Sequence, residues 1–256
     1  MKAVMLAGGM GTRLREETEY RPKPMVEIGG KPILWHIMKN LSQHNISEFV
    51  ICLGYKGDQI KDYFVNYLTR VNDLTVHLGS KSSTVYHGNF DEEHWSVTLA
   101  DTGLNTMTGG RIHRIQKYVE GERFLCTYGD GLADIDIDQL LKFHQKHKKI
   151  ATVTAVRPRT RFGAMEIDQA LKVKKFMEKP RAEKWVNGGL FIFEPHIFRY
   201  LESDCVLESD PLENLAKDGE LMAFEHNGFW QPMDTFREVQ ELNVLWDKDL
   251  APWRNW

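Results

Sequence analysis

Short continuous runs of apolar residues recur along the first 156 residues. Such runs cover residues 2–6, 49–53, 124–128 and 151–156, and apolar positions at helical spacing separate them, for example Ile33, Leu34, Ile37, Met38 and Leu41. A continuous apolar run is typical of a strand that is buried on both faces. The repeated strand–helix pattern therefore predicts an α/β fold: a doubly wound, mostly parallel (Rossmann-like) sheet with helices on both faces.

The pattern changes after residue 156. Short strands are predicted at 164–167, 173–176 and 186–193, separated by turns that contain glycine or proline, and a helix follows at 239–246. We expect these strands to form a small mixed-sheet extension that lies as a lid beside the first half. Residues 79–94 are polar and lack a period, which predicts a mobile or subunit-facing loop.

Composition and charge exclude several classes of function. The 256 residues carry a net charge of −3, so no basic excess indicates a nucleic-acid partner. No apolar run is long enough to cross a membrane, and the N-terminal run is too short for a signal peptide. The three cysteines, Cys52, Cys126 and Cys205, are far apart and form no metal-binding pair. We expect free thiols in a reducing cytoplasm.

A glycine-rich loop, GGMGTR, spans residues 8–13 directly after the first strand. Glycines at this place let backbone N–H groups approach phosphate oxygens without interference from a Cβ atom. The loop lacks the third glycine of the dinucleotide fingerprint, since Leu14 stands there, and Gly30-Lys31 is followed by Pro32, which excludes a Walker loop. A tight turn without a ligand is the plain alternative.

Two cations favour a phosphate site over a plain turn. Arg13 lies within the loop, and Lys23 stands between Pro22 and Pro24. The two prolines restrict the backbone around Lys23, so its ammonium group has a fixed direction that an anionic ligand would use.

Two carboxylates are candidates for a metal site. Asp130, in Tyr128-Gly129-Asp130-Gly131, follows a predicted core strand, at the edge where parallel sheets bind ligands. Asp234 precedes the last helix and is the natural second ligand. One or two carboxylates together with phosphate oxygens are the usual ligands of Mg²⁺. A turn residue and a helix N-cap are the structural alternatives.

Three further groups have weaker signals. Glu178-Lys179 and Asn187-Gly188 could hold hydroxyl groups and a phosphate, or could be a surface ion pair and a turn. The TGGR segment at 108–111 could meet a base or a phosphate at a helix start, or Thr108 could be a helix cap. His144 and His147 lie three residues apart and are expected to face solvent, and no nucleophile motif is present.

The ordered set GGMGTRL, PKPM, TGGR, YGDG, EKP, NGG and PMDT resembles the sugar-1-phosphate nucleotidylyltransferases over essentially the whole chain. The resemblance implies one catalytic domain over 1–256, with a nucleotide-binding half at 1–156 and a sugar-phosphate-binding half with the C-terminal helix at 157–256. It implies catalytic roles for Arg13 and Lys23 and an Mg²⁺ site at Asp130 and Asp234. The nucleotide-binding residues it implies are Leu6, Ala7, Gly8, Gly9, Gly11, Thr12, Arg13, Thr108, Arg111 and Gly129. The implied sugar-phosphate-binding residues are Tyr128, Gly163, Glu178, Lys179, Asn187 and Gly188.

Within that family the chain is most similar to members that transfer CMP from CTP to glucose 1-phosphate, which gives CDP-glucose and pyrophosphate for nucleotide-sugar synthesis of the O-antigen type. Members of this type are homo-oligomers, hexamers included. Two alternatives stay open. The same chemistry could use another sugar 1-phosphate, dTTP or UTP, and a regulatory relative could bind nucleotide sugars without catalysis. Such a relative would be expected to lose at least one of the four charged residues Arg13, Lys23, Asp130 and Asp234.

Overall fold

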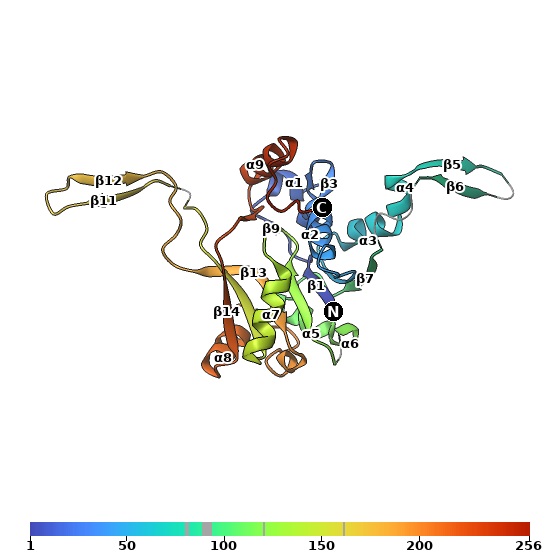
Figure 1. Ribbon diagram of the computed structural model, residues 1–256. Helices are drawn as coiled ribbons and strands as arrows, with labels where there is room; N and C mark the ends of the chain where they lie inside the picture. Colours follow the sequence, from blue (N-terminus) through green and yellow to red (C-terminus); the bar gives the residue numbers. More distant parts are fainter. Residues whose placement is uncertain (80–81, 89–93, 120, 161) are drawn as a thin grey trace.

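Seven strands form the central sheet of the computed structural model, which describes residues 1–79, 82–88, 94–119, 121–160 and 162–256 (Figure 1). In spatial order they are β14 (Leu221–His226), β10 (Ala151–Val156), β13 (Val186–Phe193), β8 (Phe124–Tyr128), β1 (Lys2–Leu6), β4 (Glu48–Leu53) and β7 (Ser96–Asp101). Every neighbouring pair is parallel except the two pairs that β13 makes. The predicted mostly parallel α/β fold is confirmed.

Helices and two-stranded sheets surround this sheet. The helices are α1 (Arg15–Thr18), α2 (Ile33–Ser42), α3 (Gly57–Val65), α4 (Tyr67–Val71), α5 (Thr108–Arg114), α6 (Gln116–Val119), α7 (Ile137–His147), α8 (Asp210–Lys217), α9 (Phe236–Asp247) and the 3₁₀ turns η1 (Lys23–Met25) and η2 (Pro195–Arg199). The antiparallel pairs are β2 (Glu27–Ile28) with β3 (Lys31–Pro32), β5 (Asp73–His77) with β6 (Ser83–His87), β9 (Gly131–Ala133) with β15 (Trp230–Pro232), and β11 (Ala164–Ile167) with β12 (Val173–Met177).

The sheet separates two apolar cores, one on each face. The side chains of β1 alternate between them: Ala3 and Met5 pack with α2 and α9, whereas Val4 and Leu6 pack with α5 and α8. A strand that is buried on both faces is apolar at most of its positions. This packing explains why the pattern predicted the core strands well.

The strand predicted at 186–193 belongs to the central sheet and not to the extension. As β13 it runs antiparallel between β8 and β10, with Leu190 opposite Thr127 and Ala151 opposite Phe193. Its second half is buried on both faces, which requires the apolar run that ends at Phe193. Sequence alone does not report the direction of a strand, so its place in the sheet was missed.

Two antiparallel ribbons project from opposite sides of the body, β5–β6 and β11–β12 (Figure 1). The strands of β11–β12 were predicted correctly, but the expected lid is wrong, because the ribbon points away from the first half. The loop expected at 79–94 is wrong for 83–87, which form β6, and residues 80–81 and 89–93 lie outside the described residues. Both faces of a projecting ribbon meet solvent, so no alternation marked the strand.

His144 and His147 do not form a solvent-facing pair, which corrects the expectation. His147 Nδ1 accepts the Lys149 N–H at 2.9 Å, so its Nε2 carries the proton and donates to Thr152 Oγ1 at 2.7 Å. The Thr152 hydroxyl then donates to His144 Nδ1 at 2.7 Å, and His144 Nε2 donates to Glu194 Oε1 at 3.2 Å. This chain of hydrogen bonds joins α7 to the sheet, and it leaves His144 only 1% exposed.

The buried histidines predict a loss of stability in acid. Burial is the main cause that lowers the pKa of His144 from 6.5 to about 4, and it does the same for His36. Because the unfolded chain binds these protons first, the contribution is complete above pH 6.5 and is lost as the pH falls towards 4. We expect roughly 2–3 kcal/mol per histidine in the free energy of unfolding. Urea denaturation from pH 7.5 to 4.5 measures it.

A substitution separates the contribution of His144 to the pH dependence of stability from that of other titrating groups. His144→Asn should make the dependence of the free energy of unfolding on pH less steep in this window, whatever it does to stability at pH 7.5. His196→Asn, at an exposed position of η2, should leave the slope as in the parent protein. If the free energy of unfolding depends on pH equally in His144→Asn and in the parent protein, His144 does not cause the loss of stability in acid.

Candidate active site

The parallel pairing of β1 and β8 brings two predicted loops together. Leu6 lies opposite Tyr128, and the Gly129 N–H donates to the Leu6 carbonyl oxygen at 3.1 Å. The glycine-rich loop after β1 and Asp130 after β8 therefore start side by side at the carboxyl edge of the sheet. This is the edge where open α/β sheets bind ligands.

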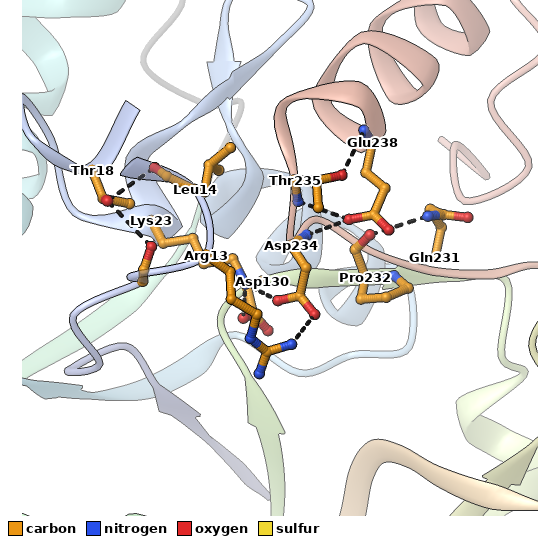
Figure 2. Close-up of polar contacts among 11 residues, drawn as sticks. Arg13, Leu14, Thr18, Lys23, Asp130, Gln231, Pro232, Asp234, Thr235 and Glu238 are labelled. Atoms are coloured by element: carbon orange, nitrogen blue, oxygen red, sulfur yellow. Dashed lines mark hydrogen bonds and ion pairs between the residues drawn. The ribbon is translucent and has the colours of Figure 1, made fainter. Parts of the chain in front are cut away.

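Asp234 reaches the same edge through a second pairing. β15 pairs with β9 so that Pro232 lies opposite Gly131, and the Met233 N–H donates to the Asp130 carbonyl oxygen at 2.9 Å. The N-cap of α9 is Thr235, which forms a capping box with Glu238. Because Thr235 caps the helix, the side chain of Asp234 is available for another role (Figure 2).

Arg13, Lys23, Asp130 and Asp234 meet in one charged cluster (Figure 2). Lys23 Nζ lies 2.6 Å from Asp130 Oδ2 and 2.6 Å from Asp234 Oδ1, and Arg13 Nη1 lies 2.5 Å from Asp234 Oδ2. Burial opposes the charge of Lys23, but the two carboxylates outweigh it and raise its pKa above the ordinary value. The Lys23 side chain is 9% exposed and that of Arg13 is 76% exposed. Lys23 is thus a fixed cation, whereas Arg13 reaches in from the surface.

The charged cluster lies in a cleft of about 390 Å³, hereafter the main cleft. Every residue predicted for the nucleotide lines it: Leu6, Ala7, Gly8, Gly9, Gly11, Thr12, Arg13, Thr108, Arg111 and Gly129. Lys23, Tyr128, Asp130 and Asp234 also line it, and the structure adds Pro24, Thr106 and Met107. Of the residues predicted for the sugar phosphate, Gly163, Glu178, Lys179, Asn187 and Gly188 are not among those that line the cleft.

The predicted sugar-phosphate residues form two groups. Asn187, at the start of β13, donates from Nδ2 to the Tyr128 hydroxyl at 3.5 Å and is thereby connected to the main cleft. Glu178 and Lys179 follow β12 at the base of its ribbon, where a Cβ on Gly163 would lie 3.2 Å from Glu178 Oε2. The predicted residues are therefore neighbours within each group, Asn187 with Tyr128 and Gly163 with Glu178. The sequence could not show that the two groups are separate.

Two side chains directly before α3, those of Tyr55 and Lys56, hold the segment that follows Arg13. The Tyr55 hydroxyl donates to the Thr18 carbonyl oxygen at 3.1 Å, and Lys56 Nζ donates to the carbonyl oxygens of Thr18 and Glu19. The Thr18 hydroxyl in turn contacts the carbonyl oxygens of Gly11 and Leu14 at 3.2 and 2.9 Å. Carbonyl groups at the end of the short helix α1 are thus satisfied by side chains.

Arg111 supports the floor of the main cleft from within the protein. It is 4% exposed, and its guanidinium donates to the carbonyl oxygens of Leu53, Gly103, Leu104 and Gly8 at 2.8–3.2 Å and to Thr102 Oγ1 at 2.8 Å. Burial lowers its pKa, but an arginine stays charged at neutral pH. A Cβ at position 8 would lie 2.2 Å from Arg111 Nη1, so only glycine fits there.

The two glycines of the TGGR segment are required by packing against residues 204–208. A Cβ on Gly109 would lie 2.5 Å from Cys205 Sγ, and one on Gly110 would lie 2.9 Å from Asp204 Cα. The Met107 N–H donates to Asp204 Oδ1 at 2.9 Å, and the Gly110 N–H donates to the Cys205 carbonyl oxygen at 3.1 Å. The start of α5 is therefore capped by this segment, and the cap residue of the helix is Met107, not Thr108.

Sequence reasoning missed Glu208, which contacts two residues of the main cleft. Its carboxylate accepts from Thr108 Oγ1 at 2.7 Å and from the Tyr128 hydroxyl. Glu208 lies in a turn before α8 without a glycine or a motif around it, so the sequence held no signal that could have identified it.

A family model described as Nucleotidyl transferase matches residues 2–235. The chain belongs to this family. Among curated relatives, a glucose-1-phosphate cytidylyltransferase of Salmonella typhi is 54% identical over the full length of both chains. A probable glucose-1-phosphate cytidylyltransferase of Bacillus subtilis is 43% identical over the same span.

Solved structures show the same fold in more distant proteins. HddC from Yersinia pseudotuberculosis aligns with a TM-score of 0.69 at 24% identity and covers 96% of this chain and 99% of its own. A putative glucose-1-phosphate thymidylyltransferase from Bacillus anthracis aligns with a TM-score of 0.70 at 21% identity, over 100% of this chain and 97% of its own. Within the described residues, no helix combines the length and the apolar character needed to span a membrane.

The packing at α5 predicts a steric defect. Gly109→Ala places a Cβ against the sulfur and the carbonyl oxygen of Cys205, at 2.5 and 2.9 Å, so the 204–208 segment must shift. We expect a loss of about 1–3 kcal/mol in the free energy of unfolding, measured by urea denaturation. Gly79→Ala is the control, since a Cβ there meets no atom within 4 Å. Equal stability of the two variants would contradict the packing described.

Proposed function

We propose that this nucleotidyltransferase transfers CMP from CTP to α-D-glucose 1-phosphate and releases CDP-glucose and pyrophosphate. The choice of substrates is supported by the full-length similarity to proteins with the name glucose-1-phosphate cytidylyltransferase, at 54% and 53% identity. The reaction chemistry is supported by the charged cluster, in which Lys23 lies between two carboxylates in the main cleft.

The proposed reaction needs no general base. The nucleophile is a phosphate oxygen of the sugar phosphate, which is already ionised near pH 7. It attacks the α-phosphorus of CTP in line with the leaving pyrophosphate, so the barrier comes from the approach of negative groups and from their alignment. This agrees with the absence of a histidine or cysteine among the residues that line the cleft.

Arg13 and Lys23 are the cations that would lower this barrier. Lys23 is fixed by burial and by its neighbouring prolines, so its charge needs little reorganisation during the reaction. In the structure both cations contact carboxylates, and the triphosphate would compete for the same contacts. Arg13 is exposed at the rim and can follow the phosphates.

Asp130 and Asp234 are suitable ligands for Mg²⁺. Their oxygens approach one common cation, the Lys23 ammonium, at 2.6 Å each, and carboxylate oxygens are the donors that Mg²⁺ prefers. When bound, Mg²⁺ would neutralise charge on the phosphate oxygens. The two carboxylates would hold it next to the phosphates, and Lys23 would remain beside them.

The binding roles are assigned to two sets of residues, of which the first lines the main cleft and the second is connected to it through Tyr128. We assign the nucleotide to the backbone of Leu6, Ala7, Gly8, Gly9, Gly11 and Thr12, with Thr108, Arg111 and Gly129. Arg111 would act chiefly by supporting the Gly8 loop, since its donors are already used by carbonyl oxygens. The sugar phosphate is assigned to Tyr128, Gly163, Glu178, Lys179, Asn187 and Gly188.

The protein is proposed to act as a homo-oligomer in the cytoplasm. Both projecting ribbons carry exposed apolar side chains, for example Val76 and Val85 on one ribbon and Met165 and Phe176 on the other. All three cysteines are free thiols, in agreement with a reducing compartment. Hexamers are the assembly that the family resemblance implies, and light scattering of the purified protein measures the mass directly.

A substrate matrix tests the proposed reaction. Pyrophosphate release is measured for CTP, UTP, dTTP, ATP and GTP, each with the 1-phosphates of glucose, mannose, galactose and N-acetylglucosamine. The expected maximum is CTP with glucose 1-phosphate, and the reverse reaction should convert CDP-glucose and pyrophosphate to CTP. A maximum at another pair would replace the proposed substrates, and no release with any pair would contradict the reaction class.

Removal of the fixed cation should impair turnover more than folding. Lys23→Ala is expected to lower kcat by roughly 100-fold or more, by analogy with loss of one preorganised transition-state donor. Thermal unfolding and circular dichroism verify that the fold is intact. Lys146→Ala removes the same charge from the exposed face of α7 and should retain full activity. Near-normal turnover of Lys23→Ala would exclude the assigned role.

Metal removal tests the carboxylate pair. EDTA should abolish pyrophosphate release and added Mg²⁺ should restore it, because the crowded phosphate charges require neutralisation. Asp234→Asn should raise the Mg²⁺ concentration for half-maximal activity at least tenfold, with Asp58→Asn as an exposed control on α3. An unchanged Mg²⁺ requirement in Asp234→Asn would remove this residue from the metal site.

A further inference from the structure

The carboxylate of Glu208 connects two residues of the main cleft that belong to different elements, Thr108 of α5 and Tyr128 of β8. Oε2 accepts a hydrogen bond from Thr108 Oγ1 at 2.7 Å, and Oε1 accepts one from the Tyr128 hydroxyl. Thr108 and Tyr128 both line the cleft, whereas Glu208 itself does not. Glu208 therefore acts on the cleft only through these two side chains.

The two partners belong to different binding regions. Thr108 lies with Thr106, Met107 and Arg111 on the side assigned to the nucleotide. Tyr128 is joined through its hydroxyl to Asn187 Nδ2, at 3.5 Å, on the side assigned to the sugar phosphate. One carboxylate thus spans the boundary between the proposed nucleotide and sugar-phosphate regions.

The direction of both hydrogen bonds is fixed. Thr108 Oγ1 already accepts the Leu207 N–H at 2.9 Å, so its single proton is directed to Glu208. Burial first, and then the hydrogen bond to Glu208, raise the pKa of Tyr128 well above its ordinary value, so the phenol remains a donor. A carboxylate accepts only, and it suits two hydroxyl donors that have no other acceptor in these contacts.

The backbone around Glu208 is held firmly. The 204–208 segment contacts the start of α5 through Asp204, Cys205 and Leu207, as described above. On the other side, the Tyr128 ring packs against Gly189, where a Cβ would lie 2.4 Å from Cδ2. Both ends of the link are therefore held in place, and the carboxylate fixes the direction of each hydroxyl group.

We propose that Glu208 is a positioning residue that aligns the nucleotide region and the sugar-phosphate region of the main cleft with each other. The inference rests on the proposed function for the assignment of each region to its substrate. Glu208 carries no ion pair in the described part of the chain, so its charge serves the two hydroxyl groups. Loss of the carboxylate releases Thr108 and Tyr128 together, and it affects the binding of both substrates.

The experiment measures kcat and both KM values for Glu208→Ala and Glu208→Gln. It uses the substrate pair on which the parent protein is most active, so the inference can be tested even if that pair is not CTP and glucose 1-phosphate. Glu208→Ala should raise each KM about five- to tenfold, since a hydrogen bond to a charged group is lost on each side. The value of kcat should change less than threefold, because no group at the reacting phosphorus is removed.

Two further variants make the result specific. Glu208→Gln keeps the shape and one acceptor oxygen, so it should recover at least half of the lost affinity for one or both substrates. Tyr128→Phe removes only one of the two donors and should raise the KM for the sugar phosphate alone. In the double variant with Glu208→Ala, this KM should be the same as in Glu208→Ala alone, because both changes break one link.

Glu202→Ala is the matched control. It removes the same charge at an exposed position shortly before the 204–208 segment, and all three kinetic constants should be unchanged. A change in only one KM for Glu208→Ala, or a loss of kcat with both KM values unchanged, would overturn the proposal. If Glu208→Ala does not fold, Glu208→Gln and Thr108→Val replace it, and unchanged KM values in both folded variants would likewise overturn it.

Discussion

The site depends on one ammonium group shared between two carboxylates that are far apart in the sequence. Lys23 draws Asp130 and Asp234 to within 2.6 Å of the same nitrogen, although one follows β8 and the other precedes α9. Two carboxylates that lie this close to a common point would repel each other strongly in a cleft of reduced dielectric if no cation stood between them. The lysine therefore keeps the acidic part of the site assembled before any ligand arrives, and the prolines beside it keep the lysine in place.

The surrounding structure serves to bring these three groups to one point. The pairing of β1 with β8 sets the glycine-rich loop beside Asp130, and the pairing of β9 with β15 adds Asp234. Arg111 supports the loop from below, and Tyr55, which precedes α3, contacts the Thr18 carbonyl oxygen after the loop. The surface proposed to bind the phosphates therefore presents loop backbone and charged side chains in fixed positions, which suits a reaction whose difficulty is charge and alignment and not proton transfer.

The core strands and the charged residues were predictable because each has a local signal. β8 and β10 were predicted with their observed bounds, since strands buried on both faces are largely apolar along their length. Arg13, Lys23, Asp130 and Asp234 each lie within two residues of a glycine or a proline, and these residues are typical of loops and close approaches. By contrast, the direction of β13, the ribbon that contains β6, the burial of His144 and the contacts of Glu208 depend on residues distant in the chain, and local patterns do not contain that information.

The antiparallel direction of β13 separates the ribbon β11–β12 from the strand pairing of the central sheet. Because Val186 pairs with Val156, the segment between β10 and β13 both leaves and re-enters the sheet at the carboxyl edge of its parallel strands. Its two ends are fastened to each other, with Thr160 N–H donating to the Pro180 carbonyl oxygen and Ala182 N–H to that of Pro158, both at 2.8 Å. Because these two hydrogen bonds join the ends of the segment, a change in the length or sequence of the ribbon beyond them need not shift the register of any core strand. The segment that carries Gly163, Glu178 and Lys179, which we propose to bind the sugar phosphate, is thus separate from the pairing of the core strands.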